Sequence, residues 1–432
     1  MNIDPARRLA FDVLRAVEAS DAYANLELAK LIRERRTGTR DAAFATELVS
    51  GTLRMQGAYD AVIGSLVDRS LDAPVRDVLR LGSHQLLSMR VPTHAAVATS
   101  VSLTKKAIGH GPSGLVNAVL RKISARSFDE WMDFLDASLQ VRSSHPEWVV
   151  AELRKALGGD EAELVELLAA DNTAPRVTLV ARPGLVDRED LPGEPSPVSP
   201  YGVEMAGGSP GDLVAVREGR AGVQDAGSQL VAIAATTPEV TGESAWLDLC
   251  AGPGGKAALL QALGDQRGVA LLANEAAPHR AALVRAAGVR EVVCGDGRRP
   301  SWPSSHFDRV LVDAPCSGLG ALRRRPESRW RRQPEDLPGL VALQGALLRS
   351  AIASTRPGGV IAYATCSPVV AETVDVVRGV LDEQPGLSLL DAPALVPWVN
   401  GAASSHLPEA IQLWPHRHGT DAMFVALLRS NG

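Results

Sequence analysis

The 432-residue sequence predicts a multidomain α+(α/β) protein, with an all-α bundle, a small linker subdomain and a doubly wound α/β domain. Two observations predict this class. Residues 1–128 repeat apolar side chains at helical spacing, without strand alternation of useful length. Residues 223–432 instead alternate short apolar runs with helical segments. The length leaves room for two or three domains with full-sized cores.

The first helical pattern shows why residues 1–128, called the helical front below, are predicted to be α-helical. Asp4 suits an N-cap and Pro5 the first helical position. Leu9, Val13 and Val17 then recur at helical spacing. Similar patterns follow over 26–32, 43–53, 75–87, 95–106 and 115–122. We therefore predict a helical bundle for residues 1–128.

Residues 129–222 form the predicted linker subdomain. Helical patterns at 130–139 and 147–157 precede a Pro- and Gly-rich region, for which we predict only loops and short strands. From residue 223 onwards, six strand candidates are mostly separated by helical segments. They are 245–250, 268–275, 291–296, 307–315, 358–366 and 422–429. This alternation predicts a doubly wound sheet, whose ligand crevice lies at the carboxyl ends of the strands.

Composition narrows the class of protein. The net charge of −5 divides into +6 over residues 1–126 and −11 over the rest, which favours a polyanionic partner for the front. No run of eighteen apolar residues predicts a membrane span, and residues 1–5 lack the basic and apolar pattern of a signal peptide. The four cysteines show no Cys-x-x-Cys spacing, and we place Cys294 in the core. We expect a cytoplasmic protein with reduced thiols and no metal.

A glycine-rich segment follows the first strand of the α/β domain and is called the glycine loop below. It consists of Cys250, Ala251, Gly252, Pro253, Gly254, Gly255 and Lys256. Glycines let the backbone approach a ligand closely, and the helix that follows presents unpaired N–H groups. A phosphate-binding P-loop is excluded because Cys250 replaces its first glycine and Ala257 its magnesium-binding hydroxyl.

Acidic residues end the next three strands. Glu275 is placed to accept ribose hydroxyls, Asp296 to accept from an exocyclic amine, and Asp313 ends the fourth strand. These acids indicate a nucleoside-bearing cofactor, but they do not separate NAD from S-adenosylmethionine. A dehydrogenase also needs an acid–base partner, and the one candidate, His306, lies at the wrong end of its strand.

Two thiols follow the fourth and fifth strands, at Cys316 and Cys366. Carbon 5 of cytosine is a poor nucleophile, but a thiolate that adds to carbon 6 makes carbon 5 enamine-like and able to attack a sulfonium methyl group. A second group must then remove the carbon 5 proton, so that elimination releases the enzyme. The two cysteines and Asp313 cover these roles.

These motifs resemble those of the RNA 5-methylcytosine methyltransferases. The segments that carry the resemblance are 223–229, 250–256, 313–320 and 363–367. The helical front resembles the NusB-type RNA-binding fold at 94–97 and 116–121. The combination is similar to the RsmB-type methyltransferases of small-subunit ribosomal RNA, with a Rossmann-like methyltransferase domain over 223–432.

The resemblance implies S-adenosylmethionine as the cofactor, with its methionine part in the glycine loop, its ribose on Glu275 and its adenine on Asp296. It places Asp313 beside the reacting base and the methyl group. It also implies that Cys366 is the nucleophile and that Cys316 assists release of the product.

Two positions depart from the family pattern. Gly252 stands where alanine is more usual, which we expect to cost little because glycine is permissive. Thr373 follows Glu372 where the family more often has Asn, so no role is carried over to that position.

An arginine-rich run follows the Cys316 motif. It contains Arg323, Arg324, Arg325, Arg329, Trp330 and Arg331. A solvated charged loop is one interpretation. Its expected place on the rim of the crevice favours RNA contacts instead, with arginine forks on phosphates and Trp330 stacked on a base.

The sequence thus predicts a monomeric enzyme that forms 5-methylcytosine in RNA, with 16S ribosomal RNA as the favoured substrate. Two alternatives stay open. One is the same chemistry on transfer RNA, and the other is an RNA-binding ribosome assembly factor without catalysis. Cofactor binding would separate the assembly factor from the enzymes, whereas a substrate map is needed to separate the two enzymes.

Overall fold

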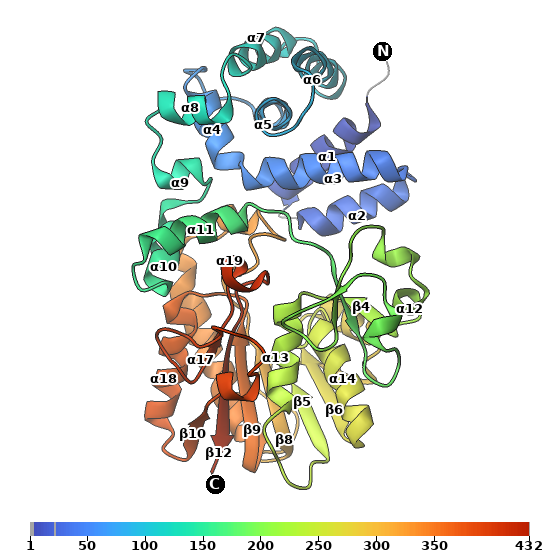
Figure 1. Ribbon diagram of the computed structural model, residues 1–432, viewed down its shortest axis with the longest axis vertical. Helices are drawn as coiled ribbons and strands as arrows, with labels where there is room; N and C mark the ends of the chain where they lie inside the picture. Colours follow the sequence, from blue (N-terminus) through green and yellow to red (C-terminus); the bar gives the residue numbers. More distant parts are fainter. Residues whose placement is uncertain (1–3, 21–22, 432) are drawn as a thin grey trace. The chain divides into compact units, whose positions relative to one another are not determined.

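The computed structural model describes residues 4–20 and 23–431, so residues 1–3 of the segment compared with a signal peptide lie outside the described residues. Its contacts divide the chain into two units (Figure 1). Unit 1 comprises Met1–Val150, Asp171–Thr173 and Leu322–Arg331. Unit 2 comprises Ala151–Ala170, Ala174–Ala321 and Arg332–Gly432.

Unit 1 is helical, as predicted. Its helices are α1 (Pro5–Ser20), α2 (Ala24–Glu34), α3 (Thr39–Arg54), α4 (Gln56–Gly64), α5 (Ala73–Leu87), α6 (Thr93–Ala107), α7 (Ser113–Ile123), α8 (Phe128–Phe134), α9 (Leu139–Arg142) and α16 (Ser328–Arg331). The start of α1 is confirmed, because Asp4 Oδ1 accepts the backbone N–H of Arg7 at 2.9 Å. Leu9 and Val13 of α1 are fully buried against α3 and α5.

Unit 2 begins with α10 (Glu147–Ala156), whose first turn belongs to unit 1, and α11 (Glu161–Asp171). A small antiparallel sheet follows in the order β2-β3-β1-β4. Its strands are β1 (Thr178–Ala181), β2 (Glu194–Pro195), β3 (Gly202–Glu204) and β4 (Ala221–Val223), and α12 (Val214–Arg217) packs on β4. The short strands predicted in this Pro- and Gly-rich region therefore form a sheet with its own small core.

The main sheet of unit 2 has the order β10-β12-β9-β8-β5-β6-β7, with β11 paired to β12. Its strands are β5 (Ala245–Asp248), β6 (Ala270–Glu275), β7 (Glu291–Cys294), β8 (Phe307–Asp313), β9 (Thr355–Thr365), β10 (Leu387–Leu390), β11 (Ile411–Gln412) and β12 (Phe424–Ser430). Strands β5 to β9 pair in parallel, while β10, β11 and β12 pair antiparallel. All six predicted strands are present, and the order reverses between β5 and β8, where such sheets bind ligands.

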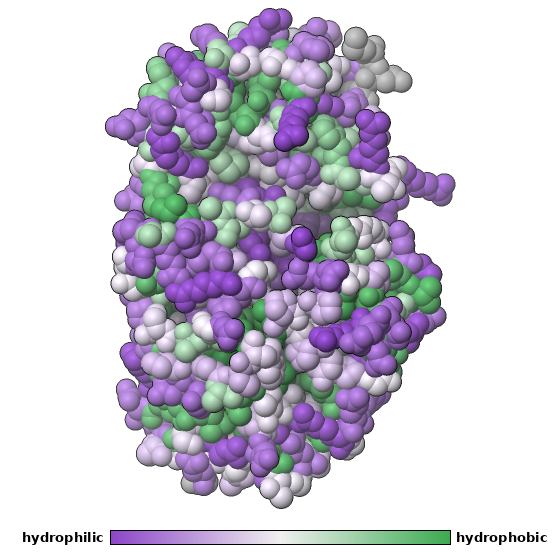
Figure 2. Space-filling view, viewed as in Figure 1, coloured by the Kyte–Doolittle hydropathy of each residue, from purple (hydrophilic) through white to green (hydrophobic). Residues whose placement is uncertain are grey.

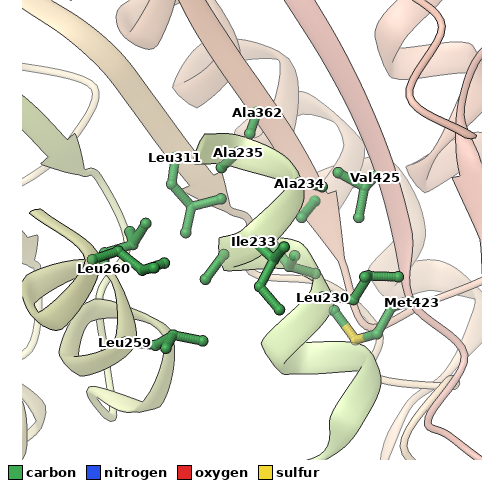
Figure 3. Close-up of a cluster of buried hydrophobic side chains, with 14 of the residues drawn as sticks. Leu230, Ile233, Ala234, Ala235, Leu259, Leu260, Leu311, Ala362, Met423 and Val425 are labelled. Carbon is green, nitrogen blue, oxygen red and sulfur yellow. The ribbon is translucent and has the colours of Figure 1, made fainter. Parts of the chain in front are cut away.

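Helices cover both faces of this sheet. They are α13 (Ala226–Thr236), α14 (Gly255–Arg267), α15 (Pro278–Ala286), α17 (Leu337–Ser354) and α18 (Val374–Glu383), with the short α19 (Pro415–His418) near the end of the chain. Both α13 and α17 contact β8 and β9 but make no substantial contact with each other, so they lie on opposite faces. Figure 3 shows Leu230 and Ile233 of α13 directed towards strand residues such as Leu311 and Val425.

Helix α17 is long and apolar enough to cross a membrane by length and composition. In the structure its residues Leu347, Leu348 and Ala351 are buried, and the helix packs on β8 and β9. Its apolar character is therefore explained by its place in the core of unit 2.

Candidate active site

The glycine loop connects β5 to α14 at the switch point of the sheet. Gly254 has φ +113° and directly precedes α14, a conformation that favours glycine. The N–H of Gly252 donates to Glu275 Oε2 at 3.0 Å, and a Cβ on Gly252 would lie 2.2 Å from that oxygen. An alanine at this position would require Glu275 to move, so glycine suits the arrangement found here, in keeping with the expectation that Gly252 costs little.

Asp248 ends β5 beside the glycine loop and fits the amino group of an amino-acid ligand. The residue is fully buried, and among the described residues its Oδ2 has no hydrogen-bond partner. Burial, reinforced by the charge of Asp313, raises the pKa of Asp248 to about 8. A buried carboxylate oxygen next to a glycine bend is suited to a ligand ammonium group. Sequence reasoning gave this acid no role.

Glu275 and Asp296 follow the next two strands along the same sheet edge, as predicted. Glu275 ends β6 and is buried, with Oε1 accepting the backbone N–H of Ala277 at 3.0 Å. Asp296 follows β7, is half-exposed and pairs with Arg298 at 2.8 Å. Hydrogen bonds from Arg298 lower the pKa of Asp296 to about 2, so this carboxylate is charged at neutral pH.

An ion pair joins the glycine loop to the end of β8. Lys256 Nζ donates to Asp313 Oδ2 at 2.8 Å, and both side chains are largely buried. Burial lowers the pKa of Lys256, but the attraction and hydrogen bond of Asp313 outweigh it, and the net shift is upwards. Asp313 is thus held in place at the edge where the sheet order reverses.

The two thiols that are distant in sequence meet in the fold. Asp313 of β8 is aligned with Ala364 of β9, so the loops after both strands leave the sheet side by side. The Sγ atoms of Cys316 and Cys366 lie 3.4 Å apart. The hydrogen bond with Cys366, together with burial, raises the pKa of Cys316 well above its usual value. Cys294 is exposed, so its predicted place in the core is wrong.

One buried carboxylate, Glu372, links the loops that carry the two thiols. Its Oε1 accepts the N–H of Ser317 at 2.7 Å and Nε2 of Gln344 at 3.0 Å. Its Oε2 accepts the hydroxyls of Ser317 at 2.5 Å and Ser367 at 2.6 Å. Each serine directly follows one cysteine, and Glu372 is fully buried. Sequence reasoning gave this residue no role, although its position shortly after the Cys366 motif was a usable signal.

Gly320 makes a second link between the two loops. Its N–H donates to the carbonyl of Cys366 at 2.9 Å, and its carbonyl accepts the N–H of Ala422 at 2.8 Å. A Cβ on Gly320 would lie 2.1 Å from the Ala422 carbonyl oxygen. Only glycine therefore permits this close approach of three backbone segments.

The arginine-rich run belongs to unit 1 rather than to the crevice region of unit 2. Arg329 is fully buried, and its Nη1 donates to Asn172 Oδ1 at 2.8 Å and to the Ser144 carbonyl at 3.1 Å. Burial lowers its pKa to about 10. The prediction that Arg329 contacts RNA is therefore corrected, because this guanidinium is committed to the interior of unit 1.

The other members of the run differ in exposure. Arg323 is buried, and the ring of Trp330 packs so closely on Gly57 that a Cβ there would lie 2.5 Å from it. Arg323 is therefore buried and Trp330 is packed within unit 1, both against expectation. Arg324 and Arg331 are partly exposed, and Arg325 is exposed. A role for these three in RNA binding stays a prediction.

Comparisons with known proteins agree with this architecture. Residues 235–429 match the family model described as 16S rRNA methyltransferase RsmB/F, and residues 4–125 match the NusB family. The ribosomal RNA small subunit methyltransferase B of Pseudomonas putida is 31% identical over 446 residues, covering 98% of each chain. The corresponding protein of Vibrio vulnificus is 32% identical over 372 residues, covering 81% of this chain and 85% of its own length.

Solved structures share the fold. The crystal structure of PH0851 has a TM-score of 0.78 and 21% identity, covering 99% of both chains. The structure of NSun6 from Pyrococcus horikoshii with SFG, an analogue of S-adenosylmethionine, has a TM-score of 0.57 and 18% identity. It covers 66% of this chain and 98% of that one. With its two family matches and its full-length relatives, the chain belongs to the RsmB/F family of 16S rRNA methyltransferases and is an S-adenosylmethionine-dependent methyltransferase.

Proposed function

We propose that this enzyme methylates carbon 5 of an unpaired cytosine in RNA through a covalent bond between Cys366 and carbon 6. The observation that carries the proposal is the pair of thiols, with Sγ atoms 3.4 Å apart, at the sheet edge that also holds Asp313. A methyltransferase acting on a nucleophilic nitrogen or oxygen has no need of two thiols in contact, whereas a carbon that must be activated has.

The chemistry assigns one thiol to attack. The thiolate of Cys366 adds to carbon 6, and the electron pair of the 5,6 double bond becomes available at carbon 5. S-adenosylmethionine supplies, when bound, an electrophilic methyl group on its sulfonium. Asp248 and the glycine loop would hold its amino-acid part, Glu275 its ribose and Asp296 its adenine. Asp313, fixed by Lys256, lies beside the reacting base.

The other thiol is assigned to release. Before reaction, Cys316 is held neutral by its contact with Cys366 and by burial, so it does not compete as a nucleophile. Adduct formation converts Cys366 into an uncharged thioether and removes the first of these causes. Cys316 can then lose its proton to water and, as a thiolate, accept the carbon 5 proton. The 5,6 double bond re-forms, and Cys366 leaves as a thiolate.

The proposed substrate is small-subunit ribosomal RNA, as the names of the full-length relatives indicate for those proteins. The match of unit 1 to the NusB family supports an RNA partner. The target base must be unpaired or flipped out, because the thiol of Cys366 has to approach carbon 6 from one face of the ring. The reaction is then a cytoplasmic one.

The test is transfer of labelled methyl from S-adenosylmethionine to unmodified small-subunit ribosomal RNA, with Cys366→Ala as the matched control. We expect label in 5-methylcytosine with the native enzyme and none with the variant. Label in another nucleotide, or equal transfer by Cys366→Ala, would contradict the proposal. Cofactor binding without transfer would redirect the search to transfer RNA, and loss of both would favour an assembly factor.

A further inference from the structure

Helices α6 and α7 enclose a groove in unit 1 that lies outside the methyltransferase site. Its volume is about 920 Å³, at the upper end of the range for ligand sites. Val97, Ala98 and Val101 form an apolar floor, while Lys105 and Arg121 stand on its two helical walls. In Figure 2, apolar surface lies between hydrophilic side chains in the region where Figure 1 places α6 and α7.

The groove is rich in basic residues. Residues 78–128 contain no Asp or Glu, and the groove lining takes Lys105, Lys106 and Arg121 from this stretch. The lining also includes His94 in the first turn of α6 and His110 just beyond the end of that helix. A fifty-residue stretch of sequence without any carboxylate is unusual, because soluble surfaces ordinarily mix both signs.

Several cations elsewhere in unit 1 are neutralised by neighbouring carboxylates. Arg15, Arg35 and Arg76 each pair with a carboxylate at 2.5–2.9 Å. Lys105 and Arg121 are exposed, and neither forms an ion pair within the described ranges 4–20 and 23–431. Instead, Nε of Arg121 donates a hydrogen bond to Asn117 Oδ1 at 3.3 Å. The two terminal nitrogens of Arg121 are therefore available to an external anion.

We propose that this groove binds an unpaired segment of the substrate RNA, with phosphates on Lys105 and Arg121 and bases or riboses over Val97, Ala98 and Val101. The RNA substrate rests on the proposed function, but the groove is separate from the reacting residues. An unpaired strand fits better than a duplex, because it presents base faces to an apolar floor. The basic walls supply the electrostatic part of the affinity.

The test measures binding of unmodified small-subunit ribosomal RNA by the full-length protein over a series of salt concentrations. The groove variant Lys105→Ala/Arg121→Ala is compared with Arg40→Ala/Arg69→Ala, which removes two exposed cations of unit 1 outside the groove. Two lost phosphate contacts reduce the slope of log K against log salt by about 1.4, since each contributes about 0.7 on a single strand. At 0.1 M salt this corresponds to a roughly 25-fold weaker affinity, with the 1 M value unchanged.

A third variant, Ala98→Trp, separates shape from charge. It fills the groove without changing the net charge, so RNA affinity should fall while the salt slope stays native if bases occupy the floor. Thermal unfolding and cofactor binding should be native in all three variants, because the substituted side chains are exposed. These readouts show that any loss of RNA binding is not a loss of fold.

Three results would overturn the proposal. The groove and control pairs could weaken binding equally, RNA affinity could be unchanged in the groove variants, or an acidic peptide of equal length could displace RNA as well as an RNA oligomer does. Failure of the proposed methylation reaction would give a result different from these three. In that case the native protein binds RNA through the groove, with the predicted change in slope, but forms no 5-methylcytosine.

Discussion

At the scale of single residues, the two thiols of the active site are proposed to play different roles, and the surroundings of Cys316 support the one proposed for it. Each follows a parallel strand and precedes a serine bound to Glu372. Cys316, however, has its pKa raised by Cys366 and by burial. A thiol that stays protonated is a poor nucleophile, so its surroundings support the release role.

The first prediction follows from that difference. Cys316→Ala should accumulate a covalent complex with RNA, because addition and methyl transfer survive while proton removal from carbon 5 is lost. Cys366→Ala should form no complex. Denaturing gel electrophoresis of the enzyme after incubation with RNA and S-adenosylmethionine measures both. Equal amounts of complex with the two variants would contradict the assignment.

The second prediction concerns Asp248 and pH. Its pKa is about 8 in the folded protein and about 3.9 in an unfolded chain, so the unfolded state loses this proton first as the pH rises. The contribution of Asp248 to stability is therefore present below about pH 4 and is lost as the pH rises to about 8. Asp248→Asn stays neutral and should not show this loss.

The measurement is thermal unfolding of the cofactor-free protein between about pH 5 and pH 9. The melting temperature of Asp248→Asn should rise relative to the native protein as the pH increases, while its affinity for S-adenosylmethionine falls because the carboxylate partner of the ammonium is gone. Parallel melting curves for the two proteins across this range would show that Asp248 is already ionised in the folded state.

At the scale of elements, the loops after β8 and β9 act as one structure. Glu372 accepts four hydrogen bonds that reach both loops and α17, since Gln344 lies on that helix. Gly320 adds a backbone link to Ala422, which lies just before β12. The contacts of Glu372 and Gly320 therefore set the distance between the two thiols. This distance matters for catalysis, because displacing reacting atoms by about 1 Å can cost roughly 10²-fold in rate.

The third prediction tests this positioning role. Glu372→Gln keeps the shape but turns an NH₂ group towards donors, so we expect a loss of about 1–3 kcal/mol in the free energy of unfolding. The kcat for methyl transfer should fall more than the KM for RNA rises, because Glu372 lies beneath the thiols. Ser317→Ala, which removes one hydroxyl donor, is the milder matched variant. A rise in KM alone would contradict a positioning role.

At the scale of the whole molecule, the chain leaves unit 2 after Ala321, contributes Leu322–Arg331 to unit 1, and returns at Arg332. Within unit 1, Arg329 donates to groups that belong to three other segments, including Arg54, Ser144 and Asn172. The methyltransferase sequence therefore supplies a buried piece of the helical unit.

The fourth prediction follows from this arrangement. Arg329→Ala leaves buried carbonyl groups without a donor, each costing about 1–3 kcal/mol, so the free energy of unfolding should drop substantially. Arg325→Ala removes an exposed guanidinium stacked on Tyr23 and should cost no more than about 1 kcal/mol. Urea unfolding of the full-length variants measures both. Equal stability of the two variants would show that Arg329 is not a structural anchor.

The elements that the sequence predicted well are those with strong local signals. The helices of unit 1 and β5, β6, β7, β8, β9 and β12 carry long apolar patterns, and the Asp4 cap is also local. The strands that were not placed individually are short, such as β10 (Leu387–Leu390) and β11 (Ile411–Gln412), and they exist because β12 pairs with them. Pairing with a distant strand leaves little trace in a segment of two to four residues.

The sequence by itself determined the helical class of the N-terminal part, the α/β class of the C-terminal part, the glycine loop and the strand-end residues Asp313, Cys316 and Cys366. The last three could be placed together because the carboxyl ends of parallel strands converge at one edge of the sheet. Only the tertiary structure decided the role of Glu372, the burial of Arg329 and the unpartnered oxygen of Asp248. Each of these depends on which distant groups surround a side chain. Charge and residue type are local properties, whereas burial and hydrogen-bond partners are set by packing between segments far apart in the chain.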